Sequence, residues 1–199
     1  MYKTIFTFAL LLTAATTATA QSPATGQILG HDYVDLGLSV MWATCNIGAS
    51  SPSDYGDYFA WGEAETKSSY TESNSATYGK SPDTFLDAAS AQWGSAWRMP
   101  TRAEFQELIN NCTWQRTTVG GHKGYRLTSK ENGNSIFLPA AGDRLGTQLN
   151  DAGKWGYYWS SSPSKSNSYL ACYLLSGRGD HYVYWNSRYY GKSIRLVSE

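Results

Sequence analysis

Hydrophobic and polar residues alternate in short runs along most of the chain, which is the pattern of half-buried β-strands. Turns rich in glycine and asparagine separate the runs, as at Gly120-Gly121 and at Asn132-Gly133-Asn134. This pattern predicts strands over residues 33–36, 38–43, 58–61, 114–118, 124–128, 135–139, 157–161, 169–175, 182–185 and 193–197.

Two segments in the middle of the chain have helical spacing instead. Residues 85–93 predict one helix, which ends at Gly94. A second helix is predicted where Thr101 and Glu104 form a capping box. Its apolar side chains then recur three and four residues apart, at Phe105, Leu108, Ile109 and Cys112. Strands, two helices and then many strands predict an α+β fold, with the helices packed on mostly antiparallel short strands joined by long irregular loops.

The N-terminus has the pattern of a secretory signal peptide over residues 1–20. Lys3 precedes an apolar run that is too short to span a bilayer, and Ala18-Thr19-Ala20 is a small-residue cleavage site. The sequence therefore predicts export from the cytoplasm, to a periplasm, a cell surface or the medium. No membrane span is expected after cleavage.

The exported part is expected to form one domain over residues 31–199. Residues 21–30 are small and polar, and predict a flexible leader. Residues 64–82 are rich in serine, threonine and tyrosine, and predict a long surface loop that is the most disordered internal segment.

Composition excludes several classes of function. The chain of 199 residues has 16 basic and 16 acidic residues, without a basic cluster, so no nucleic-acid partner is expected. The three histidines lie far apart, and no motif for a metal, a cofactor or a catalytic nucleophile occurs. We therefore expect no cofactor, no metal site and no catalytic residues.

Three cysteines are compatible with one disulfide in an exported protein. Cys45–Cys112 is the preferred pair, and Cys172 lies in an apolar run that predicts a buried strand thiol. The alternative is that all three are buried thiols. An enzymatic interpretation would need a metal or a reactive thiol, for which Cys112 or Cys172 are the candidates.

Tyrosines concentrate in the C-terminal quarter, where residues 155–190 hold eight of the fifteen. Tyrosine, tryptophan, serine and asparagine together are typical of binding surfaces, since flat rings supply contact area at low entropic cost. In residues 182–185, alternation places Val183 and Trp185 on one side as core residues, and Tyr182 and Tyr184 on the other, facing solvent or a ligand. The alternative is that the tyrosines only pack within the sheet.

Several segments resemble the Fibrobacter succinogenes major paralogous domain family. They are residues 33–49, 55–63, 97–108, 137–142, 158–162 and 188–197, which occur in the order that the family shows. The resemblance covers nearly all of the chain after the signal segment. It implies a C-type-lectin-like fold of the formylglycine-generating-enzyme type, in which the terminal strands pair and the later segments form an irregular binding face.

The C-terminal part is also similar to the variable region of proteins diversified by retroelements. That resemblance implies variable side chains of types reachable from an asparagine codon by changes at adenines, at Asp180, His181, Tyr182, Tyr184, Asn186, Ser187, Tyr189 and Tyr190. Trp185 is not reachable in this way and would belong to the scaffold. The copper-binding cysteine pair of formylglycine-generating enzymes has no counterpart here, so oxidase activity is not implied. Trp185-Asn186-Ser187 resembles the Trp-Asn-Asp element of calcium-dependent lectins, but its aspartate is missing.

Together these features predict an exported, non-enzymatic domain for adhesion or recognition. Its ligand-binding face is expected within residues 155–190, with the eight variable positions just named as ligand-binding residues and a protein or carbohydrate surface as the partner. Two alternatives stay open, namely a structural surface paralogue without a specific ligand and an enzyme on the same fold.

Overall fold

The computed structural model describes residues 22–199, so the predicted signal peptide lies outside the described part of the chain. The strands are β1 (Gly26–Ile28), β2 (His31–Val34), β3 (Met41–Asn46), β4 (Cys112–Val119), β5 (His122–Ser129), β6 (Ser135–Pro139), β7 (Asp143–Leu145), β8 (Gln148–Asn150), β9 (Trp155–Pro163), β10 (Leu170–Gly177), β11 (Asp180–Ser187), β12 (Gly191–Lys192) and β13 (Arg195–Ser198). The helices are α1 (Ala88–Trp93) and α2 (Arg102–Asn111), with single 3-10 turns at Glu72–Asn74 and Pro82–Thr84. The predicted α+β class is confirmed.

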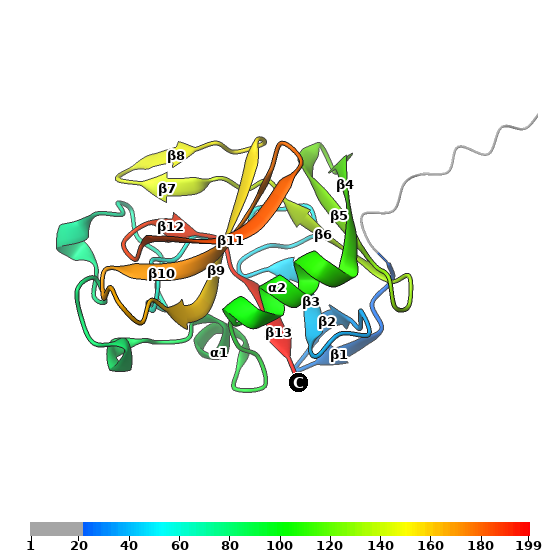
Figure 1. Cartoon of the computed structure of the whole chain (residues 1–199), viewed down its shortest axis with the longest axis horizontal. Coiled ribbons are helices and arrows are strands. Elements are labelled where there is room, and N and C mark those ends of the chain that lie inside the picture. Colours follow the sequence, from blue (N-terminus) through cyan, green and yellow to red (C-terminus); the bar gives the residue numbers. More distant parts are fainter. Residues whose placement is uncertain (1–21) are drawn as a thin grey trace, which may run out of the picture.

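The strands form four small antiparallel sheets, with the strand orders β1-β2-β3-β13, β4-β5-β6, β9-β10-β11 and β12-β7-β8. Strand β13 pairs with β3, so the last strand of the chain joins the sheet formed by the first three (Figure 1). Helix α2 lies against the sheet β9-β10-β11, which occupies the middle of the molecule.

The sheet β9-β10-β11 separates two hydrophobic cores, because neighbouring side chains along a strand point to opposite sides. On the side of α2, the core contains Tyr158 and Leu174 together with Phe105 from the helix. On the other side, Trp159 and Tyr173 belong to a second core. Both sides of the sheet are therefore largely buried, and the exposed part is restricted to the edge strand β11.

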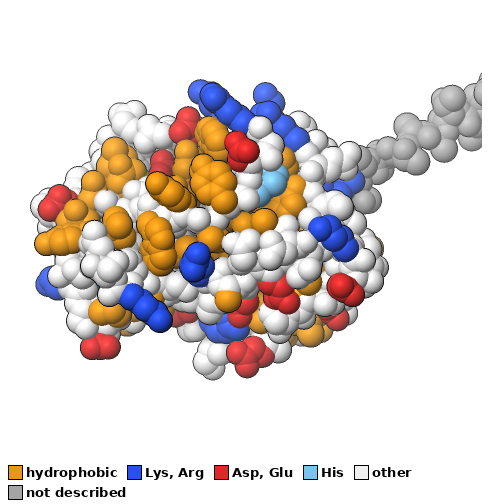
Figure 2. Space-filling view, in the orientation of Figure 1, with side chains coloured by type: hydrophobic (Ala, Val, Ile, Leu, Met, Phe, Trp, Pro, Cys, Tyr) orange, Lys and Arg blue, Asp and Glu red, His pale blue; other side chains and the backbone are white. Residues whose placement is uncertain are grey.

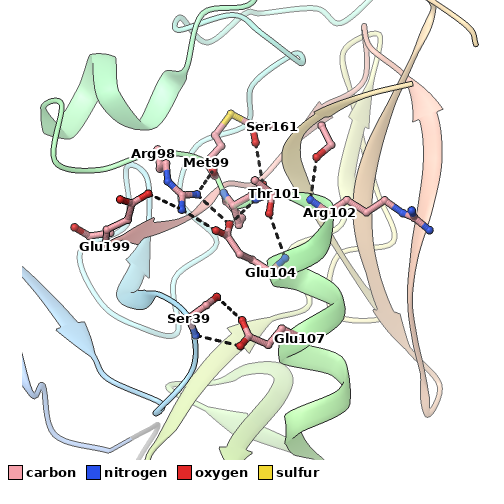
Figure 3. Close-up of polar contacts among 12 residues, drawn as sticks. Ser39, Arg98, Met99, Thr101, Arg102, Glu104, Glu107, Ser161 and Glu199 are labelled. Atoms are coloured by element: carbon pink, nitrogen blue, oxygen red, sulfur yellow. Dashed lines mark hydrogen bonds and ion pairs between the residues drawn. The ribbon is translucent and has the colours of Figure 1, made fainter. Parts of the chain in front are cut away.

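The capping box of α2 forms as predicted. The Thr101 hydroxyl accepts a hydrogen bond from the Glu104 amide at 3.2 Å, and the Glu104 carboxylate accepts one from the Thr101 amide at 2.7 Å. Arg98 donates to the same carboxylate at 2.7 Å (Figure 3). Helix α1 is shorter than predicted because Asp87, rather than a residue before Phe85, accepts hydrogen bonds from the first free amides of the helix.

The expected flexible leader is corrected by the structure. Residues 26–28 form β1, which pairs with β2 in register Gly26↔Tyr33. The Thr25 amide also donates to the Tyr33 carbonyl at 2.8 Å. Small polar side chains did not prevent order here, because the backbone itself supplies the pairing.

The expected disorder of residues 64–82 is likewise corrected. Tyr70 and Thr77 are buried within this loop. The buried guanidinium of Arg188 donates to the backbone carbonyls of Thr77 and Lys80, each at 3.1 Å. Satisfied carbonyl groups allow the polar loop to pack against the body of the protein.

Three short elements also differ from the prediction. The predicted strand at 58–61 is reduced to one bridge between Phe59 and Lys192. The hairpin β7-β8 and the two-residue strand β12 have no predicted counterpart, because they are too short to show periodicity. None of the helices formed by residues 22–199 has the length and apolar character needed to cross a bilayer.

Candidate ligand-binding face

Strand β11 exposes two tyrosines side by side along its length. The exposed fractions of Tyr182 and Tyr184 are 43% and 58%, and their rings meet edge to face with centroids 6.1 Å apart. Asp180 and Asn186 lie on the same side of the strand by alternation. These residues include two of the exposed large hydrophobic side chains of residues 22–199.

Two less exposed tyrosines on the neighbouring strands continue from Tyr184 across the same side of the sheet. Tyr173 pairs with Tyr184 across β10 and β11, and their ring centroids are 6.5 Å apart. The ring centroids of Tyr157, on β9, and Tyr173 are 5.9 Å apart. We use the name tyrosine face for the side of this sheet that carries Tyr157, Tyr173, Tyr182 and Tyr184. Hydrophobic side chains gather over the part of the molecule that contains this sheet (Figure 2).

A lysine is enclosed beneath the tyrosine face. The ammonium nitrogen of Lys192 lies between 4.7 and 5.1 Å from the centroids of four rings. These rings belong to Tyr157, Trp159, Tyr173 and Tyr190. Its Nζ also lies 2.8 Å from the Asp143 carboxylate. Ring faces attract a cation, and the carboxylate compensates its charge, so this arrangement can hold a fully buried ammonium group.

Backbone pairing fixes the position of Lys192. Its amide and carbonyl exchange hydrogen bonds of 3.0 Å with Phe59, and β12 pairs with β7 so that Lys192 lies opposite Asp143. Gly191 permits the close approach of the Tyr70 ring, since a Cβ atom there would lie 2.7 Å from a ring carbon. Burial lowers the pKa of Lys192, while Asp143 opposes that shift.

A further tyrosine cluster adjoins the lysine cage, the name used here for Lys192 with the four rings and the Asp143 carboxylate that enclose it. Tyr190 stacks on Tyr189 with centroids 5.1 Å apart, and Tyr189 meets Tyr78 edge to face at 5.0 Å. Tyr78 also meets the half-exposed Tyr169 edge to face, with ring centroids 4.7 Å apart, and the Ser187 side chain acts on the pKa of Tyr78. Tyr78 lies in the polar loop of residues 64–82, and no sequence pattern connects it to the C-terminal tyrosines.

His181 does not come together with Tyr182 and Tyr184. It lies on the other side of β11, where its ring stacks on Trp114 at 4.1 Å and meets Tyr125 edge to face at 4.5 Å. Burial lowers its pKa, so its environment favours the neutral ring. Of the eight predicted ligand-binding residues, the structure brings Asp180, Tyr182, Tyr184 and Asn186 to one side, and it places Ser187, Tyr189 and Tyr190 by the Tyr78 cluster.

The predicted core pair of β11 is confirmed at only one position. Val183 packs against the core on the side of α2. Trp185 is half-buried and belongs to neither core, and the Arg102 guanidinium lies 5.9 Å from its ring centroid. Arg102 is the first residue of α2 and precedes the buried apolar residues of the helix, so Trp185 lines a surface groove instead.

The predicted Cys45–Cys112 disulfide is wrong, because all three cysteines are free. Cys112 is buried in the core beside α2, whereas Cys45 lines a shallow pocket with His31 and Trp93. The two side chains therefore point to different surroundings. Burial raises the pKa of Cys112 to about 11 and also raises that of Cys172, so both thiols are protonated at neutral pH.

Metal ligands are not grouped in the described part of the chain, where no cluster of three or more histidine, cysteine, aspartate or glutamate residues could hold an ion. Comparison with known proteins found no matching family model, no matching curated protein and no matching solved structure.

Proposed function

We propose that the protein is an exported, non-enzymatic recognition domain that binds a protein or glycan surface through the tyrosine face. The observation that carries this proposal is the exposure of Tyr182 and Tyr184 on an otherwise packed sheet. An isolated exposed hydrophobic residue needs no explanation, but two adjacent rings on a rigid strand form a patch that a partner can cover.

The neighbouring tyrosine on β10 favours binding rather than packing alone as the role of these rings. Tyr173 is 6% exposed and packs edge to face beside Tyr184, while β11 pairs with β10 without a break in register. A ring that is already fixed loses little conformational entropy when a partner arrives. Tyrosines in such positions are frequent hot spots of binding energy. Asp180 and Asn186 would add hydrogen bonds at the margin.

The family resemblance supports the same proposal. On that basis we propose a C-type-lectin-like fold, and the pairing of β3 with β13 agrees with it. We further propose that the C-terminal region is diversified by a retroelement. A near-copy of the segment encoding residues 158–197, located beside a reverse-transcriptase gene and differing at adenines, would support this. Its absence would leave the tyrosine face without that argument.

The test compares three forms of the purified protein on one array of defined glycans and purified extracellular proteins. The forms are the unchanged protein, the variant Tyr182→Ala/Tyr184→Ala, and the control variant Leu29→Ala/Leu86→Ala. The two leucines are 64% and 61% exposed, so the control removes a comparable apolar surface elsewhere.

We expect at least one ligand of the unchanged protein to bind the tyrosine variant at least tenfold more weakly, because each hot-spot ring contributes roughly 1–3 kcal/mol. The leucine variant should bind normally. Unchanged binding of every ligand by the tyrosine variant would overturn the proposal. A thermal midpoint as low as that of a core substitution would show that the two rings are core residues.

A further inference from the structure

A surface groove lies on the side of β11 opposite Tyr182 and Tyr184, and it is lined by cationic, apolar and hydroxyl side chains. It lies between the start of α2, the connection from β9 to β10, and Trp185, and its volume is about 630 Å³. The lining residues are Arg102, Ser162, Pro163, Ser164, Lys165, Leu170 and Trp185, with Ser166 and Asn167 at the loop. This volume falls within the range of small-ligand sites.

The groove has two cations and no anion among its lining residues. Arg102 and Lys165 are both exposed, and neither belongs to an ion pair among residues 22–199. The Arg102 side chain extends away from the carboxylates of Glu104 and Glu199 and toward the sheet (Figure 3). Its guanidinium is therefore free to form two parallel hydrogen bonds with a planar carboxylate.

The remaining walls combine an apolar surface with hydroxyl groups. Trp185 and Leu170 supply the apolar part, and three serines and an asparagine supply donors and acceptors. Within the loop, the backbone amide of Asn167 donates a hydrogen bond to Ser164 Oγ at 3.2 Å. The backbone amide of Arg102 donates one to Ser162 Oγ at 3.0 Å. The hydroxyl of Ser162 thereby joins the end of β9 to the first turn of α2.

We propose that this groove binds an acidic saccharide, meaning a glycan that carries a sugar carboxylate. The carboxylate would pair with Arg102 and Lys165, and a C–H face of the sugar would pack on Trp185. The serine and asparagine side chains would bond the sugar hydroxyls. A small inorganic anion would leave the tryptophan and the hydroxyl wall unused, and an apolar ligand would leave both cations without a partner. This site goes beyond the tyrosine face and does not depend on it.

Calorimetric titration of the full chain with tri-galacturonate tests the proposal, with the fully methyl-esterified trisaccharide as the uncharged control. The same titration with 3′-sialyllactose against lactose covers the second common sugar carboxylate. At least one acidic glycan should bind at millimolar affinity or better, and its uncharged counterpart should bind at least tenfold more weakly. Binding should weaken as salt rises.

Matched variants locate the site. Arg102→Gln/Lys165→Gln should lower the affinity for the acidic glycan at least tenfold. Trp185→Leu should lower this affinity too, but the acidic glycan should still bind more tightly than its uncharged counterpart. Arg116→Gln, at an exposed arginine on β4, should bind as the unchanged protein does. Tyr182→Ala/Tyr184→Ala should also bind normally, which separates this site from the tyrosine face.

Four results would overturn the proposal. They are the absence of binding to both acidic glycans, equal binding of the neutral counterparts, full retention of affinity in Arg102→Gln/Lys165→Gln, and displacement of the bound glycan by equimolar inorganic phosphate. The last result would make the groove a general anion site instead of a saccharide site.

Discussion

The ammonium group of Lys192 and the carboxylate of Asp143 form an ion pair in which both side chains are buried, with 0% and 9% of their surfaces exposed. Four aromatic rings complete the enclosure of the ammonium group. Rings alone attract a cation by at most a few kcal/mol, which is too little to offset its removal from water. The carboxylate is therefore essential to the arrangement, in which two rings of the tyrosine face, Tyr157 and Tyr173, lie against the ammonium group.

Removal of the carboxylate should destabilise the protein strongly. Asp143→Asn leaves a buried ammonium group without its counter-charge, and we expect a loss of about 3–5 kcal/mol in the free energy of unfolding. Glu199→Gln breaks an ion pair with Arg98 that is largely exposed on the glutamate side, and should change stability by less than about 1 kcal/mol. Urea unfolding at pH 7 measures both values.

The double variant Asp143→Asn/Lys192→Met refines this prediction. Methionine fills the aromatic cage without a charge, so the double variant should be more stable than Asp143→Asn alone. A double variant that is less stable than the single one would mean that the ammonium group, rather than its packing volume, supports the rings.

The extent to which the sequence predicts this molecule differs between its parts. Helix α2 is predictable because its signals are local: a capping box, and apolar residues three and four positions apart. The sidedness of Tyr182 and Tyr184 followed from strand alternation in the same way. Both features need only neighbours along the chain.

The lysine cage could not be predicted, because its groups come from separate elements. Asp143, Tyr157, Tyr173 and Lys192 lie on β7, β9, β10 and β12, and β7 and β12 are too short to show a pattern. Lysine is also among the residues most often found on the surface. Strand alternation alone predicts that Trp185 is a core residue, whereas the structure places it in a groove beside Arg102. Its surroundings depend on α2, which is distant in sequence, so a local pattern could not predict them.

Stability should fall as the pH rises above about 10, where model phenols ionise. Burial raises the pKa of eight phenols above the ordinary value, and the shift is largest at Tyr58, Tyr157, Tyr158 and Tyr173. Above pH 10 the unfolded chain loses these protons and the folded protein keeps them, so the free energy of unfolding decreases with pH. Lys192 acts in the opposite sense because its folded pKa is lowered, but it is one group and its effect is complete near pH 10.4.

Tyr173→Phe tests the origin of that decrease. This variant lacks one phenol with a raised pKa, so its stability should fall less steeply above pH 10, by up to about 1.4 kcal/mol per pH unit. Urea unfolding of both proteins at pH 8 corrects for any change in packing. Identical slopes between pH 10 and 11.5 would mean that the Tyr173 phenol ionises equally in both states.

Arg188 should keep the loop at residues 64–82 packed against the body of the protein. Its guanidinium donates to the carbonyls of Thr77 and Lys80 and lies over the Trp61 ring at 4.3 Å. Arg188→Ala removes these bonds, so the loop should open locally and trypsin should cleave after Lys80 at least tenfold faster. Mass spectrometry of a timed digest identifies the site. Arg116→Ala is the control, and simultaneous cleavage throughout the chain would indicate global unfolding instead.

The three cysteines should behave as free thiols of different reactivity. Cys45 is half-exposed, while Cys112 and Cys172 are buried. A thiol with a pKa of about 11 has on the order of 0.1% thiolate at pH 8, so Cys112 should react slowly even where reagent reaches it. A thiol-specific reagent should therefore modify Cys45 first in the native protein and all three cysteines in urea.

Dithiothreitol should leave the thermal midpoint unchanged, because no covalent link is lost. An intact mass that is lower by two hydrogen atoms without reductant would show instead that an oxidised pair forms on export, and a peptide map would then identify the two partners.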